Sequence, residues 1–227
     1  MSSRLLHNGA LASLGCAATF VFGFVLLVTQ LMPYIELQQN PQEAVEFVLE
    51  NHAMLSIWHF VIYVLFGVLF AILVIVLHRQ FSPVPTLLTQ LASVMGLVWV
   101  SLVIASGMLA NVGLMQVVNM ASAQPDLAPS LWLAVVTVTQ GLGGSNEIVG
   151  GLWVLLVSVA LWQRGLYTKA LATIGVVAGM AGIVSAAPPL SDLGAVFGLL
   201  LIGWFIYLSR LMMCESAIVA DRESGGV

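Results

Sequence analysis

Charged side chains are scarce in this chain of 227 residues: Asp, Glu, Lys and Arg make up 7%, against 60% hydrophobic residues. Soluble globular proteins carry roughly 25% charged residues, so the composition excludes an ordinary soluble domain. The formal net charge of −4 offers no basic surface for nucleic acid, and we expect no nucleic-acid partner. Almost the whole chain is therefore available for membrane spans.

Cysteines and catalytic motifs are also nearly absent. Cys16 and Cys214 map to the cytoplasmic half or edge of the predicted spans, a reducing compartment, so we expect packing thiols and no disulfide. The sequence has no metal-protease helix motif, Gly-rich phosphate loop, Cys-x-x-Cys pair or nucleophile elbow. These absences favour a protein that is not an enzyme, and the sequence identifies no cofactor.

Long apolar runs take up most of the chain instead. A membrane-spanning helix needs about 20 apolar residues, and polar gaps and prolines divide the chain into such runs. The predicted spans cover residues 9–32, 52–78, 86–115, 131–163, 168–187 and 193–213. We therefore predict an all-α integral membrane bundle of six transmembrane helices, a single domain over residues 1–214, followed by a frayed polar tail over residues 215–227.

The basic residues give the predicted orientation. All six lie in gaps or tails on one side of the predicted spans: Arg4, Arg79, Arg164, Lys169, Arg210 and Arg222. Most of the acidic residues lie on or next to the opposite side. Because cytoplasmic loops carry the excess of Lys and Arg, both termini and the 215–227 tail are predicted to be cytoplasmic.

The longest outer segment connects the first two spans. Asn40 and Pro41 have the residue types of an N-cap and a first helical position, with Glu43 reaching back as in a capping box. Polar and apolar residues then occupy separate helix faces: Glu43, Glu46 and Glu50 on one, Val45, Val48 and Leu49 on the other. We predict an outer amphipathic helix over residues 41–50.

Two further patterns concern the outer side. Tyr34, Trp58 and Trp132 fall at the depth of the outer interface, as the residues of an aromatic belt do. Residues 116–130 contain Pro125 and Pro129, so this outer loop is expected to be irregular.

Small residues line one face of the fifth predicted span. The spacing is 3-4-3-4 through Ala172, Gly175, Gly179, Gly182 and Ala186, and Gly194 and Gly198 form a similar pair in the sixth span. In lipid, close backbone approach through small residues holds helices together. We expect this ridge to pack inside the chain; the alternative is a homo-oligomer or a partner membrane subunit that uses it.

Glu147 is the charged residue that lies inside an apolar run, where an ionisable group is costly unless it is paired or hydrated. It precedes Arg164 by 17 residues, roughly 26 Å along a helix, in a hydrocarbon core about 30 Å thick. Glu147 is therefore predicted to lie near the outer edge of the core. His59 and Ser106 fall at the same depth.

These depths point to a polar pocket that opens toward the outer face. Its candidate residues are His52, His59, Ser106, Asn111, Asn146 and Glu147, with His59 and Glu147 as the ionisable pair. One interpretation is a hydrogen-bonded network that caps helices and fixes their packing. The other is a site for a ligand, an ion or a proton, and a metal ion held by His52, His59 and Glu147 is a variant of it.

The fourth predicted span is too long for one perpendicular crossing. Gly141, Gly143 and Gly144 mark where it departs from a straight helix, and we favour a continuous helix kinked there. The alternative is a break, after which Gly144 or Ser145 caps a second half-helix, as is common in transporter sites.

Residues 146–158, Asn-Glu-Ile-Val-Gly-Gly-Leu-Trp-Val-Leu-Leu-Val-Ser, are followed by an inner turn and a Gly-rich span. In this segment, in span order and in loop lengths, the chain resembles a family of small bacterial multi-span membrane proteins classified only as a domain of unknown function. The resemblance implies a helical bundle in the bacterial inner membrane. It implies no activity.

The sequence therefore predicts a non-enzymatic multi-pass protein embedded in the lipid bilayer. It would act as an accessory or interaction subunit, or bind a small or lipidic ligand in the pocket near the outer leaflet. The alternatives are a small transporter that uses the Glu147 region and a membrane enzyme with a metal at His52, His59 and Glu147.

Overall fold

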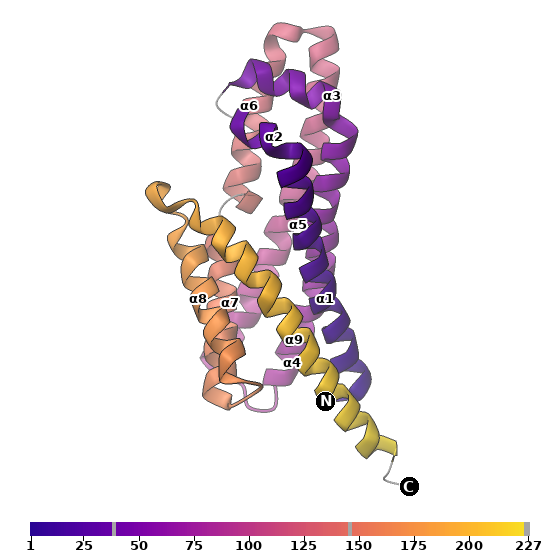
Figure 1. Cartoon of the computed structure of the whole chain (residues 1–227), viewed down its shortest axis with the longest axis vertical. Helices are drawn as coiled ribbons and strands as arrows, with labels where there is room; N and C mark the ends of the chain where they lie inside the picture. Colours follow the sequence, from indigo (N-terminus) through magenta and orange to yellow (C-terminus); the bar gives the residue numbers. More distant parts are fainter. Residues whose placement is uncertain (38–39, 145–146, 225–227) are drawn as a thin grey trace. The chain divides into compact units, whose positions relative to one another are not determined.

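The computed structural model describes residues 1–37, 40–144 and 147–224, and over these ranges the chain is all-α (Figure 1). The α-helices are α1 (Ser3–Leu26), α2 (Met32–Glu36), α3 (Pro41–His59), α4 (Phe66–Phe81), α5 (Leu87–Ala123), α6 (Ala128–Thr139), α7 (Ile148–Arg164), α8 (Lys169–Val184) and α9 (Leu193–Ser224). Between them lie the π-helical segments η1 (Leu27–Leu31), η3 (Phe60–Leu65) and η5 (Gln140–Gly144) and the 3-10 turns η4 (Pro125–Leu127) and η6 (Pro188–Leu190).

Five helical segments of the described chain are long and apolar enough to cross a membrane. They are Ser3–Tyr34, Pro41–Phe81, Leu87–Ala123, Pro125–Arg164 and Leu193–Ser224. The sixth predicted span corresponds to α8, which is apolar but has 16 residues, about 24 Å, and so is shorter than a core of about 30 Å. The predicted all-α, multi-pass architecture is confirmed, with five long spans and one short apolar helix.

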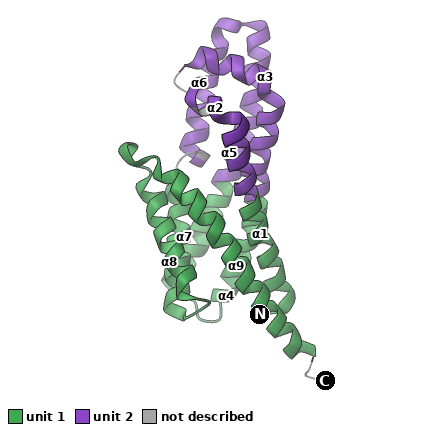
Figure 2. Cartoon of the chain, viewed as in Figure 1, with its two compact units in different colours: residues 1–18, 67–101, 146–227 green, residues 19–66, 102–145 purple. Residues whose placement is uncertain are grey.

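The chain divides into two compact units (Figure 2). Unit 1 comprises residues 1–18, 67–101 and 146–227, and unit 2 comprises residues 19–66 and 102–145. All six basic residues belong to unit 1, whereas unit 2 has five acidic residues and no Lys or Arg in its sequence.

An aromatic cluster forms the centre of unit 1. The ring of Phe70 lies 4.6 Å from those of Trp99 and Trp153, and Trp153 lies 5.7 Å from Trp204. Glycine makes this packing possible, because a Cβ on Gly150 would lie 2.5 Å from the Trp99 ring. Phe70, Trp153 and Trp204 are 1% exposed or less, so these rings supply much of the buried apolar surface of the unit.

The small-residue ridge of α8 packs against α7 within unit 1. A Cβ on Gly179 would lie 2.7 Å from the carbonyl oxygen of Gly151, and one on Gly151 would lie 2.8 Å from that of Gly179. Gly182 contacts Phe197 of α9. The expected packing inside the chain is confirmed over Gly175–Gly182, so this stretch is not free for a partner; Ala186 is exposed.

Polar contacts in unit 1 join segments that are distant in sequence. Gln80 donates to the hydroxyl of Tyr167 at 2.8 Å and to Glu215 at 3.2 Å. Ser3 donates to Glu223 at 2.6 Å, and Ser216 donates to the carbonyl oxygen of Ser3 at 2.8 Å. The end of α4, the turn between α7 and α8, the start of α1 and the last turns of α9 therefore take part in one set of contacts. Residues 215–224 are helical, so the expected fraying of this part of the tail is wrong.

An apolar cluster holds unit 2 together. It contains Val45 and Val48 of α3, Leu114 and Val117 of α5, and Trp132 of α6, among others. Because α5 continues to Ala123, the irregular loop expected over residues 116–130 is wrong. Its prolines are accommodated in the first turns of η4 and α6, where a missing backbone N–H costs nothing.

The predicted outer helix exists and continues into the second span. α3 begins at Pro41 with Asn40 in the N-cap position, but the Asn40 side chain makes no capping bond to the backbone and donates to the Glu43 carboxylate instead. Glu43 is exposed and Val48 is buried, as expected. Leu49, expected on the apolar face, is 37% exposed.

The fourth span is broken at its glycines. Gly143 has a φ of 121°, a conformation outside the right-handed helix, and α7 starts again at Ile148 with Glu147 in the N-cap position. The favoured continuous, kinked helix is therefore wrong, because a positive φ turns the chain out of the helical path. The predicted cap at Ser145 lies outside the described residues.

Candidate functional site

His59 lies at the end of α3, where the π-helical segment η3 begins. It belongs to unit 2, and its side chain is 2% exposed. A π-helical turn widens the helix locally and is frequent at functional sites. The sequence thus brings an ionisable ring into the interior at a point where the helix geometry changes.

Aromatic rings surround this imidazole. Trp58 lies 5.4 Å from the His59 ring, and Tyr34 and Tyr63 lie at 6.0 Å, the latter stacked. The hydroxyl of Tyr34 approaches His59 Nε2 at 3.4 Å. Trp132 completes the group at 5.8 Å from Tyr34.

The aromatic belt predicted for the outer interface is instead part of the protein interior. Trp58 and Trp132 are 7% and 3% exposed, and Trp58 Nε1 donates to the carbonyl oxygen of Gly23 at 3.1 Å. Trp58 and Tyr34 lie against the His59 ring, and Trp132 packs against Tyr34. Their shared depth with His59 was the sequence signal that they belong to the site.

Asn111 of α5 is the polar side chain beside His59. The same packing places Gly107, one turn earlier on α5, against Tyr63, one turn later on the helix that carries His59. His59 Nδ1 and Asn111 Oδ1 are fully enclosed, and neither has a hydrogen-bond partner beyond the other in the described part of the chain. Two enclosed polar atoms that bond with no third group therefore lie in one aromatic-lined region.

Ser106 lies five residues before Asn111 on α5 and links this helix to α6. Its hydroxyl donates to the carbonyl oxygen of Thr139, the last residue of α6, at 3.5 Å. The Thr139 hydroxyl is itself enclosed and without a partner among the described residues. Thr139 was not among the predicted site residues, because a threonine inside an apolar run carries little signal.

His52 does not join this group. It precedes His59 by seven residues on α3, about 10.5 Å along the helix, and its Nδ1 bonds with the carbonyl oxygen of Leu49 at 3.0 Å. One ion could not contact both imidazoles on a regular helix at that separation. Among the described residues, no group of three or more His, Cys, Asp or Glu side chains is arranged to hold a metal ion.

Glu147 belongs to unit 1, at the start of α7. Its Cγ would lie 3.9 Å from a Cβ on Gly194, a position that is equally close to Ser185, so its side chain lies near the start of α9. His59 belongs to unit 2, and the pairing of Glu147 with His59 stays a prediction. Asn146 lies outside the described residues.

Comparison with known proteins places the chain in a family. The profile of DUF4386, a domain of unknown function, matches residues 9–209. Because the match covers most of the chain, the protein belongs to this family, and the resemblance carried by residues 146–158 is confirmed. No curated protein and no solved structure matches the chain.

Proposed function

We propose that this DUF4386 protein is a non-enzymatic membrane protein of the bacterial inner membrane that binds a small or lipidic ligand at the His59 cluster. The observation that carries the proposal is the enclosed pair His59 Nδ1 and Asn111 Oδ1, which have no partner beyond each other in the described chain. Leaving a buried polar group unsatisfied costs about 1–3 kcal/mol, so a ligand that bonds with both atoms is stabilised by removing that cost.

The surroundings indicate the chemistry of the ligand. An imidazole nitrogen and an amide oxygen together match a hydroxyl or amine group. Trp58, Tyr34 and Tyr63 offer ring faces for an apolar or cationic portion. Since unit 2 has five acidic residues and no basic residue, its field favours neutral or cationic ligands over anions.

The depth of His59 supports a ligand taken from the outer leaflet. His59 precedes Arg79 by 20 residues, about 30 Å along a helix, which spans the hydrocarbon core. With the basic end in the cytoplasm, His59 lies at the outer edge.

Native mass spectrometry of protein purified in mild detergent tests the proposal. We expect a small molecule to stay bound to the wild-type protein and to be lost in Asn111→Leu. The matched control is Asn119→Leu, because Asn119 is an exposed residue of the same helix. Equal small-molecule retention in both variants, or none in the wild type, would contradict a site at His59.

An accessory or interaction subunit is the other form of a non-enzymatic function. It predicts a second protein at fixed stoichiometry in the same preparation. That outcome, with no small molecule bound, would replace the ligand proposal.

A small transporter is the second candidate function, supported by the broken fourth span. Discontinuous helices at mid-chain glycines form the binding sites of many transporters, and Glu147 lies at the start of the second half. In proteoliposomes with a pH-sensitive dye, a proton-coupled transporter would carry protons, and Glu147→Gln would stop the flux. Asp192→Asn, at an exposed residue, is the control. No flux in the wild type would exclude proton coupling.

A further inference from the structure

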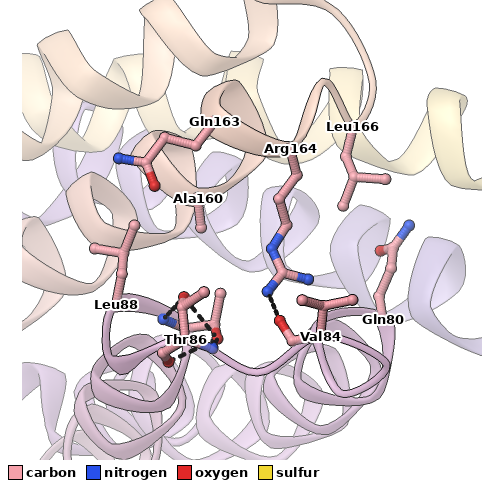
Figure 3. Close-up of a pocket in the computed structure, with 9 residues that line it drawn as sticks. Gln80, Val84, Thr86, Leu88, Ala160, Gln163, Arg164 and Leu166 are labelled. Carbon is pink, nitrogen blue, oxygen red and sulfur yellow. Dashed lines mark hydrogen bonds between the residues drawn. The ribbon is translucent and has the colours of Figure 1, made fainter.

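A pocket in unit 1 is independent of the His59 cluster. It has a volume of about 470 Å³ and lies between the turn that follows α4, the start of α5 and the end of α7 (Figure 3). This volume is within the range of roughly 300–1,000 Å³ typical of ligand sites. We propose that it binds the phosphate headgroup of an anionic phospholipid.

Arg164 supplies the positive charge of this pocket. Its guanidinium donates to the carbonyl oxygen of Phe81 at 3.0 Å and to that of Val84, and it lies over the Phe81 ring, 5.3 Å from the centroid. Figure 3 shows the side chain extended across the pocket toward the turn. These contacts hold the guanidinium in place, and its five N–H donors outnumber the two carbonyl bonds.

The other polar side chains of the pocket already have hydrogen-bond partners within the protein, so Arg164 and Gln163 are the groups that would contact the ligand. Thr86 and Thr89 bond with each other and with their own backbone at the start of α5. The amide of Gln80 donates to Tyr167 and Glu215, and burial keeps the pKa of Tyr167 well above its usual value, so that hydroxyl stays neutral. Gln163 is exposed and also lines the pocket, and its amide adds a neutral donor to the wall.

The charge and position of the pocket match a lipid headgroup. None of the described residues that line it is acidic, so the phosphate meets no like charge at this wall. Val84, Leu88 and Leu166 give it an apolar side, and Val84 is 66% exposed, as suits contact with the glycerol and upper acyl carbons. The pocket lies where polar turns interrupt the apolar runs, which is headgroup depth, and basic pockets on the cytoplasmic side bind such headgroups.

Native mass spectrometry with equal amounts of phosphatidylglycerol and phosphatidylcholine of the same acyl chains tests this inference. We expect the wild-type protein to retain phosphatidylglycerol preferentially. Arg164→Gln should reduce that preference about five-fold, the usual effect of one basic residue near an anionic surface. Because Arg164→Gln also removes contacts to the turn, Gln163→Glu serves as a second variant that leaves those contacts intact and should reduce the preference as well.

Two controls change charge elsewhere in unit 1. Arg210→Gln removes an exposed basic residue, and Gln90→Glu adds a carboxylate to an exposed position that does not line the pocket. Both should keep the lipid preference. An equal loss in the controls, or no preference in the wild type, would overturn the inference. If millimolar inorganic phosphate abolishes the preference, the site takes soluble phosphate and the lipid assignment is wrong.

Discussion

The glycines of this chain differ in what a side chain at each position would meet. At Gly179 a Cβ would contact the backbone of Gly151 and Leu155 within 3 Å, whereas at Gly203 no heavy atom lies within 4 Å. Backbone cannot move aside as the end of a flexible side chain can. The sequence spacing showed which glycines share a face, and the contacts show which of them are required for packing.

Gly179→Leu should destabilise the protein, because it forces α7 and α8 apart where Gly179 meets the α7 backbone. Overpacking typically costs about 1–3 kcal/mol. Thermal unfolding in detergent, followed by tryptophan fluorescence, measures the effect. Gly203→Leu is the control, since leucine favours the helix by up to about 1 kcal/mol over glycine where there is space. Equal stability of Gly179→Leu and the wild type would mean that the α7–α8 contact is not tight.

His59 illustrates how much of a site the sequence can indicate. Its depth and helical spacing identified it, Ser106 and Asn111 as candidates, and the structure brings Asn111 beside it. The sequence could not show that Tyr34 lies against this imidazole and that Trp132 packs against Tyr34, because these residues come from different elements. Neither could it show that His52, on the same helix, is separate from the group.

The break between α6 and α7 is the main irregularity at the scale of single elements. Gly141 and Gly143 both lie in η5, and a Cβ added to either would meet no heavy atom of the described residues within 4 Å beyond the adjacent backbone, but only Gly143 of the two has a positive φ. Because neither position is crowded, a difference between substitutions at Gly141 and Gly143 would report backbone strain alone.

Gly143→Ala should destabilise the fold, because a φ of 121° is strained for any residue with a Cβ. Such strain costs about 1–3 kcal/mol. Gly141→Ala should be neutral or slightly stabilising, and the same thermal unfolding assay compares the two. If both substitutions had the same effect, the break would not depend on the conformation of Gly143.

The prediction that rested on the prolines of residues 116–130 was wrong. Pro125 and Pro129 were expected to make residues 116–130 irregular, yet both occupy early helical positions. α5 extends past the predicted span because Val117 is buried in the unit 2 cluster. Burial contributed by distant residues thus stabilises helix beyond the apolar run that the sequence displays.

At the scale of the whole molecule, charge is divided between the units. Unit 1 contains all six Lys and Arg residues, whereas the Asp, Glu, Lys and Arg positions of unit 2 are all acidic. In unit 1 the contacts of Ser3 with Glu223 and of Gln80 with Tyr167 join the basic ends of several helices. This arrangement agrees with the prediction that these ends share one side of the membrane.

Cysteine labelling of intact cells tests the predicted orientation. In a Cys214→Ser background, where the remaining Cys16 is buried, a membrane-impermeant maleimide should label Glu43→Cys. Arg222→Cys should react only after lysis, because the positive end is expected in the cytoplasm. Labelling of position 222 and not of position 43 in intact cells would reverse the orientation.

The sequence by itself determined the class of this protein, its helical content and the approximate place of its spans, because hydropathy is a local property that needs no knowledge of neighbours. The tertiary structure decided what depends on several elements at once. It showed the α8 ridge packed against α7, the rings of Tyr34 and Trp58 against His59 with Trp132 packed on Tyr34, and the turn out of the helix at Gly143. Each of these depends on contacts or backbone angles set by residues distant in sequence, which a pattern of hydrophobic and polar residues does not contain.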